Sequence, residues 1–187
     1  MNAELGGPLE GRLSWSGRVP LEWRPLDALP EREHLDRREE RNFALLSALA
    51  FIEHGPGRRA EDPAPLAGQL EHLEAKFDLV LAMLSEVLMP DGAGPDLARV
   101  TLSGDGVALE TDAPVDPGTA VEIDLYLSTI VPRPVRLAGV VRPNLSPGSD
   151  AMVVEFRRIG PRVREQLQQL VFRRHRRTIA RQRPNIA

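Results

Sequence analysis

Ser103 and Gly106 combine, three residues apart, a small polar side chain with a backbone that other groups can approach closely. They flank the pair Gly104-Asp105, and short runs with apolar residues at alternate positions lie on either side. Glycine accepts positive φ angles, so the pair suits a tight turn between two strands. We predict a β-hairpin over residues 99–111, with a serine hydroxyl and a bare glycine backbone near its tip.

The other reactive residue types form no recognisable catalytic pattern. Ser103 does not lie in a G-x-S-x-G sequence, and the four histidines lie on or next to predicted helices without a matching acidic pattern. The chain has no cysteine, no H-x-x-x-H pair and no calcium-loop spacing. We therefore expect a protein that is not an enzyme and that holds no metal ion or cofactor.

The composition is that of a folded protein with a substantial core. Hydrophobic residues make up 42% of the 187 residues and charged residues 27%. No run approaches the roughly 20 apolar residues that span a bilayer, and the first residues have neither the basic nor the apolar region of a signal peptide. We expect a cytoplasmic protein with no membrane insertion.

Three segments follow one another along the chain. Residues 12–27 alternate apolar and polar side chains, which predicts one strand or two short ones interrupted near Gly17 and Pro20. Residues 31–89 predict two helices, one over 31–54 and a second ending near Met89, separated by Gly55-Pro56-Gly57. Residues 97–183 predict short strands and a closing helix from about Pro161 to Arg181.

The second of these helices carries a heptad pattern. Its apolar residues are separated by alternating steps of four and three, which is typical of a coiled coil, with leucine or phenylalanine at a and mostly valine at the later d positions. This combination favours three or four strands over two, so we expect a homo-oligomer. The alternative is an intramolecular hairpin in which residues 31–54 pack on 66–88. The predicted seam consists of Leu66, Leu70, Leu73, Phe77, Val80, Leu84 and Val87.

The strands after Gly94 predict a small antiparallel barrel. Val121, Ile123, Leu125 and Leu127 share one face, and residues 135–141 and 152–156 repeat the alternation between proline- and glycine-rich turns. The closing helix is rich in arginine and could contact nucleic acid. We favour instead a solvated helix face, because no aromatic residue except Phe172 interleaves with Arg173, Arg174, Arg176 and Arg177.

This order of elements resembles a PilZ domain. The matching pieces are residues 18–21, 101–106, 118–123, 139–142 and 152–156. The two helices inserted between the first strand and the hairpin resemble the atypical, tetramer-forming branch of the family, so the resemblance favours a tetramer as the homo-oligomer. The resemblance implies an α+β fold: a small antiparallel PilZ-like β-barrel with a C-terminal helix and an inserted two-helix, heptad-bearing extension.

The resemblance also implies cyclic di-GMP as the ligand. The family motif is R-x-x-x-R followed by D/N-x-S-x-x-G, and the implied ligand-binding residues here are Arg18, Thr101, Ser103 and Gly106. Ser14 stands where the first arginine is expected, and Thr101 stands where Asp or Asn is expected. Each loss of a charged hydrogen bond costs about one to two decades of affinity, so we expect weak binding. A literal R-x-x-x-R, Arg37 to Arg41, lies on the predicted first helix as a solvated charge run.

Two functions follow from these expectations. The first is a PilZ-type regulatory protein, a divergent cyclic di-GMP receptor that acts through contacts with a protein partner that the sequence does not identify. The second is an oligomeric adaptor that has lost cyclic di-GMP binding.

Overall fold

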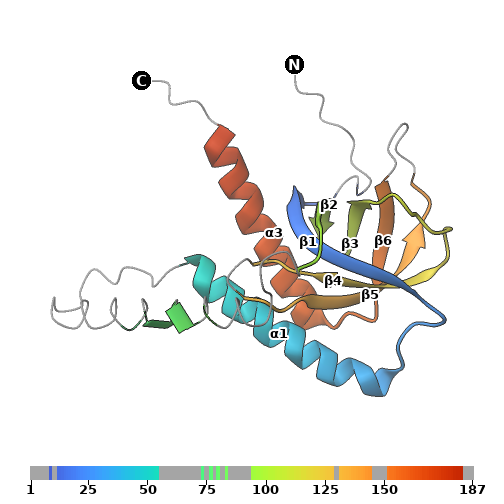
Figure 1. The fold of residues 1–187 in the computed structure, drawn as a ribbon, viewed down its shortest axis with the longest axis horizontal. Helices are drawn as coiled ribbons and strands as arrows, with labels where there is room; N and C mark the ends of the chain where they lie inside the picture. The colour runs from blue at the N-terminus through green and yellow to red at the C-terminus, as the bar shows by residue number, and fades with distance from the viewer. Residues whose placement is uncertain are drawn as a thin grey trace.

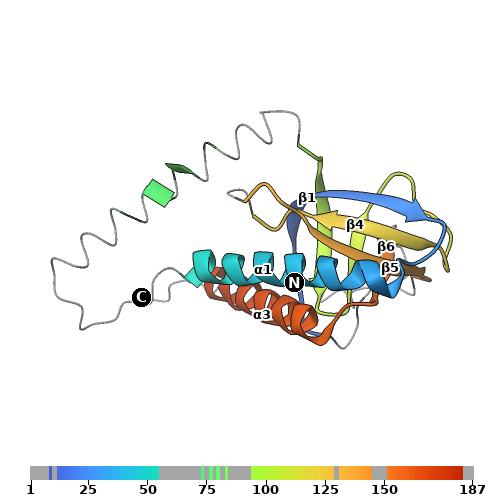
Figure 2. The ribbon, with the colours of Figure 1, turned by 90° about the horizontal axis from the view of Figure 1, so that it is seen from below.

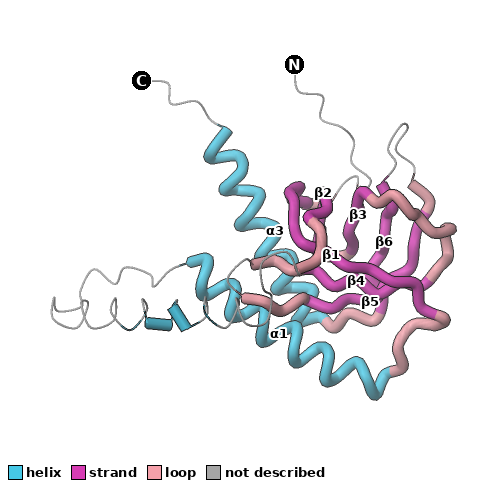
Figure 3. Tube along the Cα trace, viewed as in Figure 1, coloured by secondary structure: helices cyan, strands magenta, loops and turns pink. Residues whose placement is uncertain are grey.

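Six antiparallel strands close into a barrel against which two long helices pack (Figures 1 and 3). The computed structural model describes Leu9, residues 12–54, 94–128, 131–144 and 151–182, and Leu73, Lys76, Phe77, Leu79, Val80 and Met83. The strands follow one another around the barrel in the order β1-β2-β3-β6-β5-β4. The predicted α+β barrel with a C-terminal helix is confirmed. The elements are β1 (Ser14–Leu26), α1 (Arg32–His54), β2 (Leu97–Ser103), β3 (Gly106–Glu110), β4 (Ala120–Leu125), β5 (Val135–Arg142), β6 (Ala151–Arg157) and α3 (Pro161–Gln182).

The first strand closes the barrel by pairing with two neighbours. Its first half, as far as Pro20, pairs with β2, and its second half, from Leu21, pairs with β4. Proline has no N–H group, so it fits at the point where the strand changes partner. There the carbonyl of Pro20 accepts a hydrogen bond from the Tyr126 N–H at 3.0 Å. Residues 14–26 therefore form one continuous strand, not two.

The predicted alternation of β4 fills the barrel interior. Val121, Ile123, Leu125 and Leu127 are buried, together with the inward residues of the neighbouring strands. The opposite face of β4 is also buried, because the carboxylate of Glu122 is covered by arginines from β1, α1 and β5. A polar face of this strand is thus part of the interface with the first helix.

The two helices lie side by side against the barrel (Figure 2). Four apolar residues of α3, Val163, Leu167, Leu170 and Val171, join the barrel core, and Leu45, Leu46 and Leu49 of α1 join the same cluster. Ile179, near the end of α3, is 44% exposed because the helix continues past the barrel. No helix of the described residues is both long and apolar enough to cross a lipid bilayer.

The predicted heptad seam is only partly described. Leu73, Phe77 and Val80 are helical, and their exposed fractions are 52%, 63% and 60%. Leu66, Leu70, Leu84 and Val87 lie outside the described residues. The buried leucines of α1 pack in the core with α3 and the barrel. Among the described residues, the alternative hairpin between residues 31–54 and the second helix therefore has no support.

Candidate functional site

The hairpin between β2 and β3 forms as predicted, and Ser103 holds its turn. The Ser103 hydroxyl accepts hydrogen bonds from the N–H groups of Asp105 at 3.2 Å and Gly106 at 3.1 Å. It donates to the Gly106 carbonyl at 3.2 Å. Because the side chain is buried and its hydroxyl has three partners, Ser103 stabilises the turn from inside the fold.

Thr101 and Arg18 lie at different distances from this turn. Thr101 shares a hydrogen bond of 2.9 Å with the hydroxyl of Ser16 on the neighbouring strand. The antiparallel register places Ser14 opposite Ser103, whereas Arg18 lies opposite Arg99. Arg18 is therefore four positions, or roughly 13 Å, along the strand from Ser103. The register therefore places Ser14, and not Arg18, directly beside Ser103.

Gly106 lies where two strands approach each other closely. It pairs with Glu155 of β6. A Cβ atom on Gly106 would lie 2.6 Å from the backbone carbonyl oxygen of Val154, well inside contact distance. The glycine is required by its own barrel, and it is buried, since the side chain of Leu9 would lie 3.5 Å from the same Cβ atom.

Two carboxylates beside Gly106 each bind a pair of arginines. The Oδ1 atom of Asp105 lies 3.3 Å from Nε of Arg164, and its Oδ2 atom lies 3.8 Å from Nη1 of Arg12. The Oε2 atom of Glu155 lies 2.5 Å from Nε of Arg142 and 3.0 Å from Nη2 of Arg157. We refer to Arg12, Arg142, Arg157 and Arg164 as the hairpin arginines, and to the surface that they form with Asp105, Gly106 and Glu155 as the hairpin face.

The hairpin face carries an excess of positive charge. Four guanidinium groups surround two carboxylates. The hydrogen bond from Arg142 holds the pKa of Glu155 below its ordinary value of 4.5, with the positive charges of Arg157, Arg142 and Arg12 acting in the same direction against the effect of burial. Glu155 is therefore ionised at neutral pH, and two positive charges remain to attract an anion.

Sequence reasoning did not assemble this cluster. The four arginines come from the segment before β1, the ends of β5 and β6, and the first turn of α3. The available signal was that Arg142 and Arg157 are at outward positions of alternating strands, since Val141, Val154 and Phe156 point inward. The strand order that brings them together was not predictable from this alternation.

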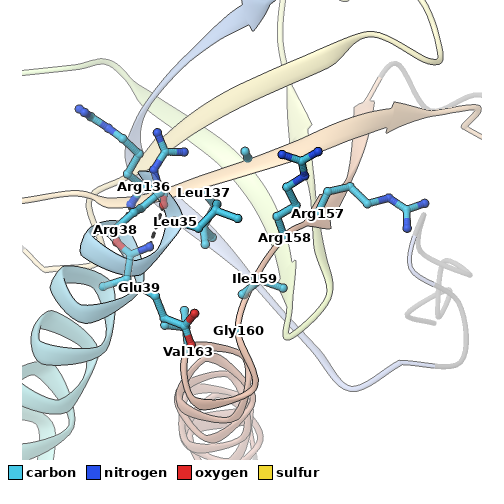
Figure 4. Close-up of a pocket in the computed structure, with 12 residues that line it drawn as sticks. Leu35, Arg38, Glu39, Arg136, Leu137, Arg157, Arg158, Ile159, Gly160 and Val163 are labelled. Carbon is cyan, nitrogen blue, oxygen red and sulfur yellow. Dashed lines mark hydrogen bonds between the residues drawn. The ribbon is translucent and has the colours of Figure 1, made fainter. Parts of the chain in front are cut away.

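Away from the hairpin face, a small crevice lies between α1 and the start of α3 (Figure 4). Leu35, Arg38, Arg157, Ile159 and Val163 are among the residues that line it. Its volume of about 20 Å³ has room for about one water molecule. A shallow, open hollow of about 1020 Å³ adjoins it, but the carboxylates of Glu31, Asp36 and Glu39 line that hollow. The hairpin face, with its excess of arginines, is therefore the better candidate for an anionic ligand.

The basic C-terminal helix is partly used inside the protein. Arg173, Arg174 and Arg177 surround the carboxylate of Glu53 at the end of α1, with distances of 3.7, 2.9 and 3.9 Å. Arg174 also lies over the ring of Trp15, 4.8 Å from its centre. Arg173 and Arg174 are largely buried, so the expectation of a solvated face is wrong for these two residues. Among the described residues, no group of acidic or histidine side chains is placed to hold a metal ion.

A closed barrel with an S-x-x-G hairpin and a helix packed against it defines a PilZ-type domain. Residues 46–184 match the family model described as "Atypical PilZ domain, cyclic di-GMP receptor". The match covers most of the chain, and the protein belongs to this family. The matched range begins within α1, so the strand β1 that closes the barrel lies outside it.

A solved structure shares the fold over nearly the whole chain. It is a pathogenic protein from Xanthomonas campestris, described as a tetrameric PilZ domain self-assembled through an unusual helical bundle. The two proteins are 24% identical, with a TM-score of 0.70 and 91% of each chain covered. Among curated protein sequences, none matches the chain.

Proposed function

We propose that the protein is a divergent cyclic di-GMP receptor that signals through protein–protein contacts and has no catalytic role. The observation that carries this proposal is the hairpin face, where four guanidinium groups surround the two carboxylates beside Gly106. Guanidinium groups bind phosphate oxygens with two parallel hydrogen bonds and stack on aromatic bases. Ser14 stands where the family motif has its first arginine and cannot make these contacts. The hairpin arginines can make them instead.

Isothermal titration calorimetry with cyclic di-GMP tests the proposal. We expect saturable heat at micromolar ligand, and Arg157→Ala should weaken binding about 10-fold because it removes one charged contact. The matched variant is Arg18→Ala. If Arg18 retains the role that the family motif implies, this variant weakens binding as well. If only the hairpin arginines contact the ligand, it leaves the affinity unchanged.

The second candidate function is an oligomeric adaptor without nucleotide. It is favoured by the internal use of the motif residues, since the hydroxyl of Ser103 is saturated by the turn and Thr101 is paired with Ser16. Absence of heat at millimolar cyclic di-GMP would overturn the receptor proposal and leave the adaptor.

We also propose that the protein assembles as a homotetramer through residues 66–88. The heptad residues Leu73, Phe77 and Val80 are exposed in the single chain. Exposed apolar residues in a row indicate a surface that a partner covers. The assembly of the Xanthomonas campestris protein through a helical bundle supports the same arrangement here.

Leu73→Glu tests this assembly, with Leu79→Glu as the matched control. Both leucines are exposed in the single chain, but Leu73 occupies a d position and Leu79 a c position outside the seam. We expect light scattering to give about four times the chain mass of 20.7 kDa for the wild type and for Leu79→Glu. Leu73→Glu should give a smaller mass, and an unchanged mass for this variant would contradict the proposed seam.

A further inference from the structure

We propose that Arg12 and Arg164 bind a phosphate group of the ligand and that Asp105 occupies both arginines until the ligand displaces it. The inference rests on the proposed function as a cyclic di-GMP receptor. It adds residues outside the family motif and an internal competitor at the tip of the hairpin.

The geometry of the two arginine pairs singles out Asp105. Its contacts to Arg164 and Arg12 are 3.3 and 3.8 Å long, whereas those from Glu155 to Arg142 and Arg157 are 2.5 and 3.0 Å. Long, partly solvated ion pairs contribute little free energy, so the Asp105 carboxylate is the easier of the two to displace. Glu155 is held by shorter hydrogen bonds and remains in place.

The carboxylate of Asp105 is not needed to form the turn. The backbone N–H of Asp105 donates to Ser103, and its backbone carbonyl accepts from the N–H of Phe156 at 2.8 Å. These bonds do not involve the side chain, and asparagine is as well suited to turns as aspartate. Replacing the carboxylate by an amide therefore leaves the backbone of the hairpin intact.

The two arginines approach the hairpin from different parts of the chain. Arg164 lies in the first turn of α3, and Arg12 lies just before β1. The side chains of Arg164 and Arg12 are 46% and 49% exposed, so a ligand can reach both. A phosphodiester offers the same type of anionic oxygen as the Asp105 carboxylate, so it competes for both guanidinium groups.

Asp105→Asn is the test, because it removes the competitor while both arginines stay. In calorimetry with cyclic di-GMP, we expect this variant to bind roughly 2- to 30-fold more tightly than the wild type, the value of two exposed ion pairs. Asp112→Asn is the matched control. It removes the same charge from an exposed position beyond the far end of β3, and it should leave the affinity within about twofold.

A double variant shows whether the gain acts through the arginines. Arg164→Gln should weaken binding, and Asp105→Asn should improve it less in the Arg164→Gln background than in the wild type. Urea unfolding of each variant verifies that the barrel is intact.

The outcomes separate this inference from the proposed function. Wild-type binding with no gain, or a loss, in Asp105→Asn overturns the inference and leaves the receptor function standing. An equal gain in Asp112→Asn also overturns it, because the effect would then be one of net charge. Binding only by Asp105→Asn supports the inference in its strongest form. Absence of binding by every variant at millimolar ligand overturns the receptor function together with the inference.

Discussion

At the scale of single residues, two positions of the S-x-x-G signature are required by the fold itself. Ser103 makes three hydrogen bonds within the turn, and Gly106 allows β3 and β6 to approach. The sequence predicted the hairpin, with Gly106 as a ligand-binding residue and not as one that the barrel itself requires. It did not predict the hairpin arginines, because residues 12, 142, 157 and 164 are brought together only by the closed barrel.

Gly106→Ala should destabilise the protein by about 1–3 kcal/mol, the usual cost of inserting an atom into a packed region. The new methyl group would lie 2.6 Å from the backbone carbonyl of Val154, which cannot move without disturbing the pairing of β3 with β6. The measurement is the free energy of unfolding in urea.

Gly104→Ala is the control for this variant. Its new methyl group would meet the flexible side chain of Gln168, which can turn away. Gln168 is exposed and can change its rotamer, so we expect a smaller cost than for Gly106→Ala, about 0.5–1.5 kcal/mol. Equal losses in the two alanine variants would show that the contact with Val154 does not limit this position.

At the scale of elements, the inserted helix α1 docks on the barrel through polar groups as well as through Leu45, Leu46 and Leu49. Arg38 binds the buried carboxylate of Glu122, and Asn42 bonds to the backbone of Arg136 on β5. An apolar period predicts a helix that packs through apolar residues. The apolar pattern correctly predicted the extent of this helix. It did not predict that Arg38 and Asn42 would contact the barrel, because they are polar.

Asn42 replaces a missing strand partner. The pairing of β5 with β6 stops at Ala138, so the backbone groups of Arg136 face the helix instead. The Asn42 amide donates to the Arg136 carbonyl at 2.7 Å and accepts from its N–H at 3.1 Å. A side-chain amide has the same donor and acceptor as a backbone amide, which is why it can complete the ladder.

Asn42→Ala should lower the free energy of unfolding by about 2–4 kcal/mol, because it leaves a buried donor and a buried acceptor without partners. Urea unfolding measures the change. Arg41→Ala is the control, since it truncates the neighbouring side chain at an exposed position of the same helix and should cost less than about 0.5 kcal/mol. If Asn42→Ala costs no more free energy of unfolding than Arg41→Ala, then water satisfies the backbone groups of Arg136 in place of the amide.

At the scale of the whole molecule, ion pairs connect the first and second halves of the chain. Residues 1–95 carry 10 basic and 17 acidic side chains, and residues 96–187 carry 14 and 10. The asymmetry was evident in the sequence, but the pairing was not. In the structure, Glu53 from the acidic half binds Arg173, Arg174 and Arg177 from the basic half. Arg174 also donates to the carbonyl of Leu127, so this junction connects α1, α3 and the end of β4.

Glu53→Gln tests this junction. The carboxylate and two of its arginines are only about 15% exposed, so the neutral amide would leave buried guanidinium groups without a counter-charge. Breaking one side of a buried ion pair typically costs 3–5 kcal/mol, and partial exposure reduces this to about 2–4 kcal/mol. Hydrogen exchange should show faster opening in the last turns of α1 and the middle of α3, together with a lower urea midpoint.

Glu40→Gln provides the same chemical change at an exposed position on the same helix, and its midpoint and exchange should match the wild type. The location of the faster exchange also matters. The contact of α3 with the hairpin is at Arg164, more than one helical turn from the arginines that bind Glu53. If Glu53 joins only the helices and the end of β4, the amides of β2 and β3 keep their protection. A loss of protection in these strands that equals the loss in α1 would show that the junction supports the whole barrel.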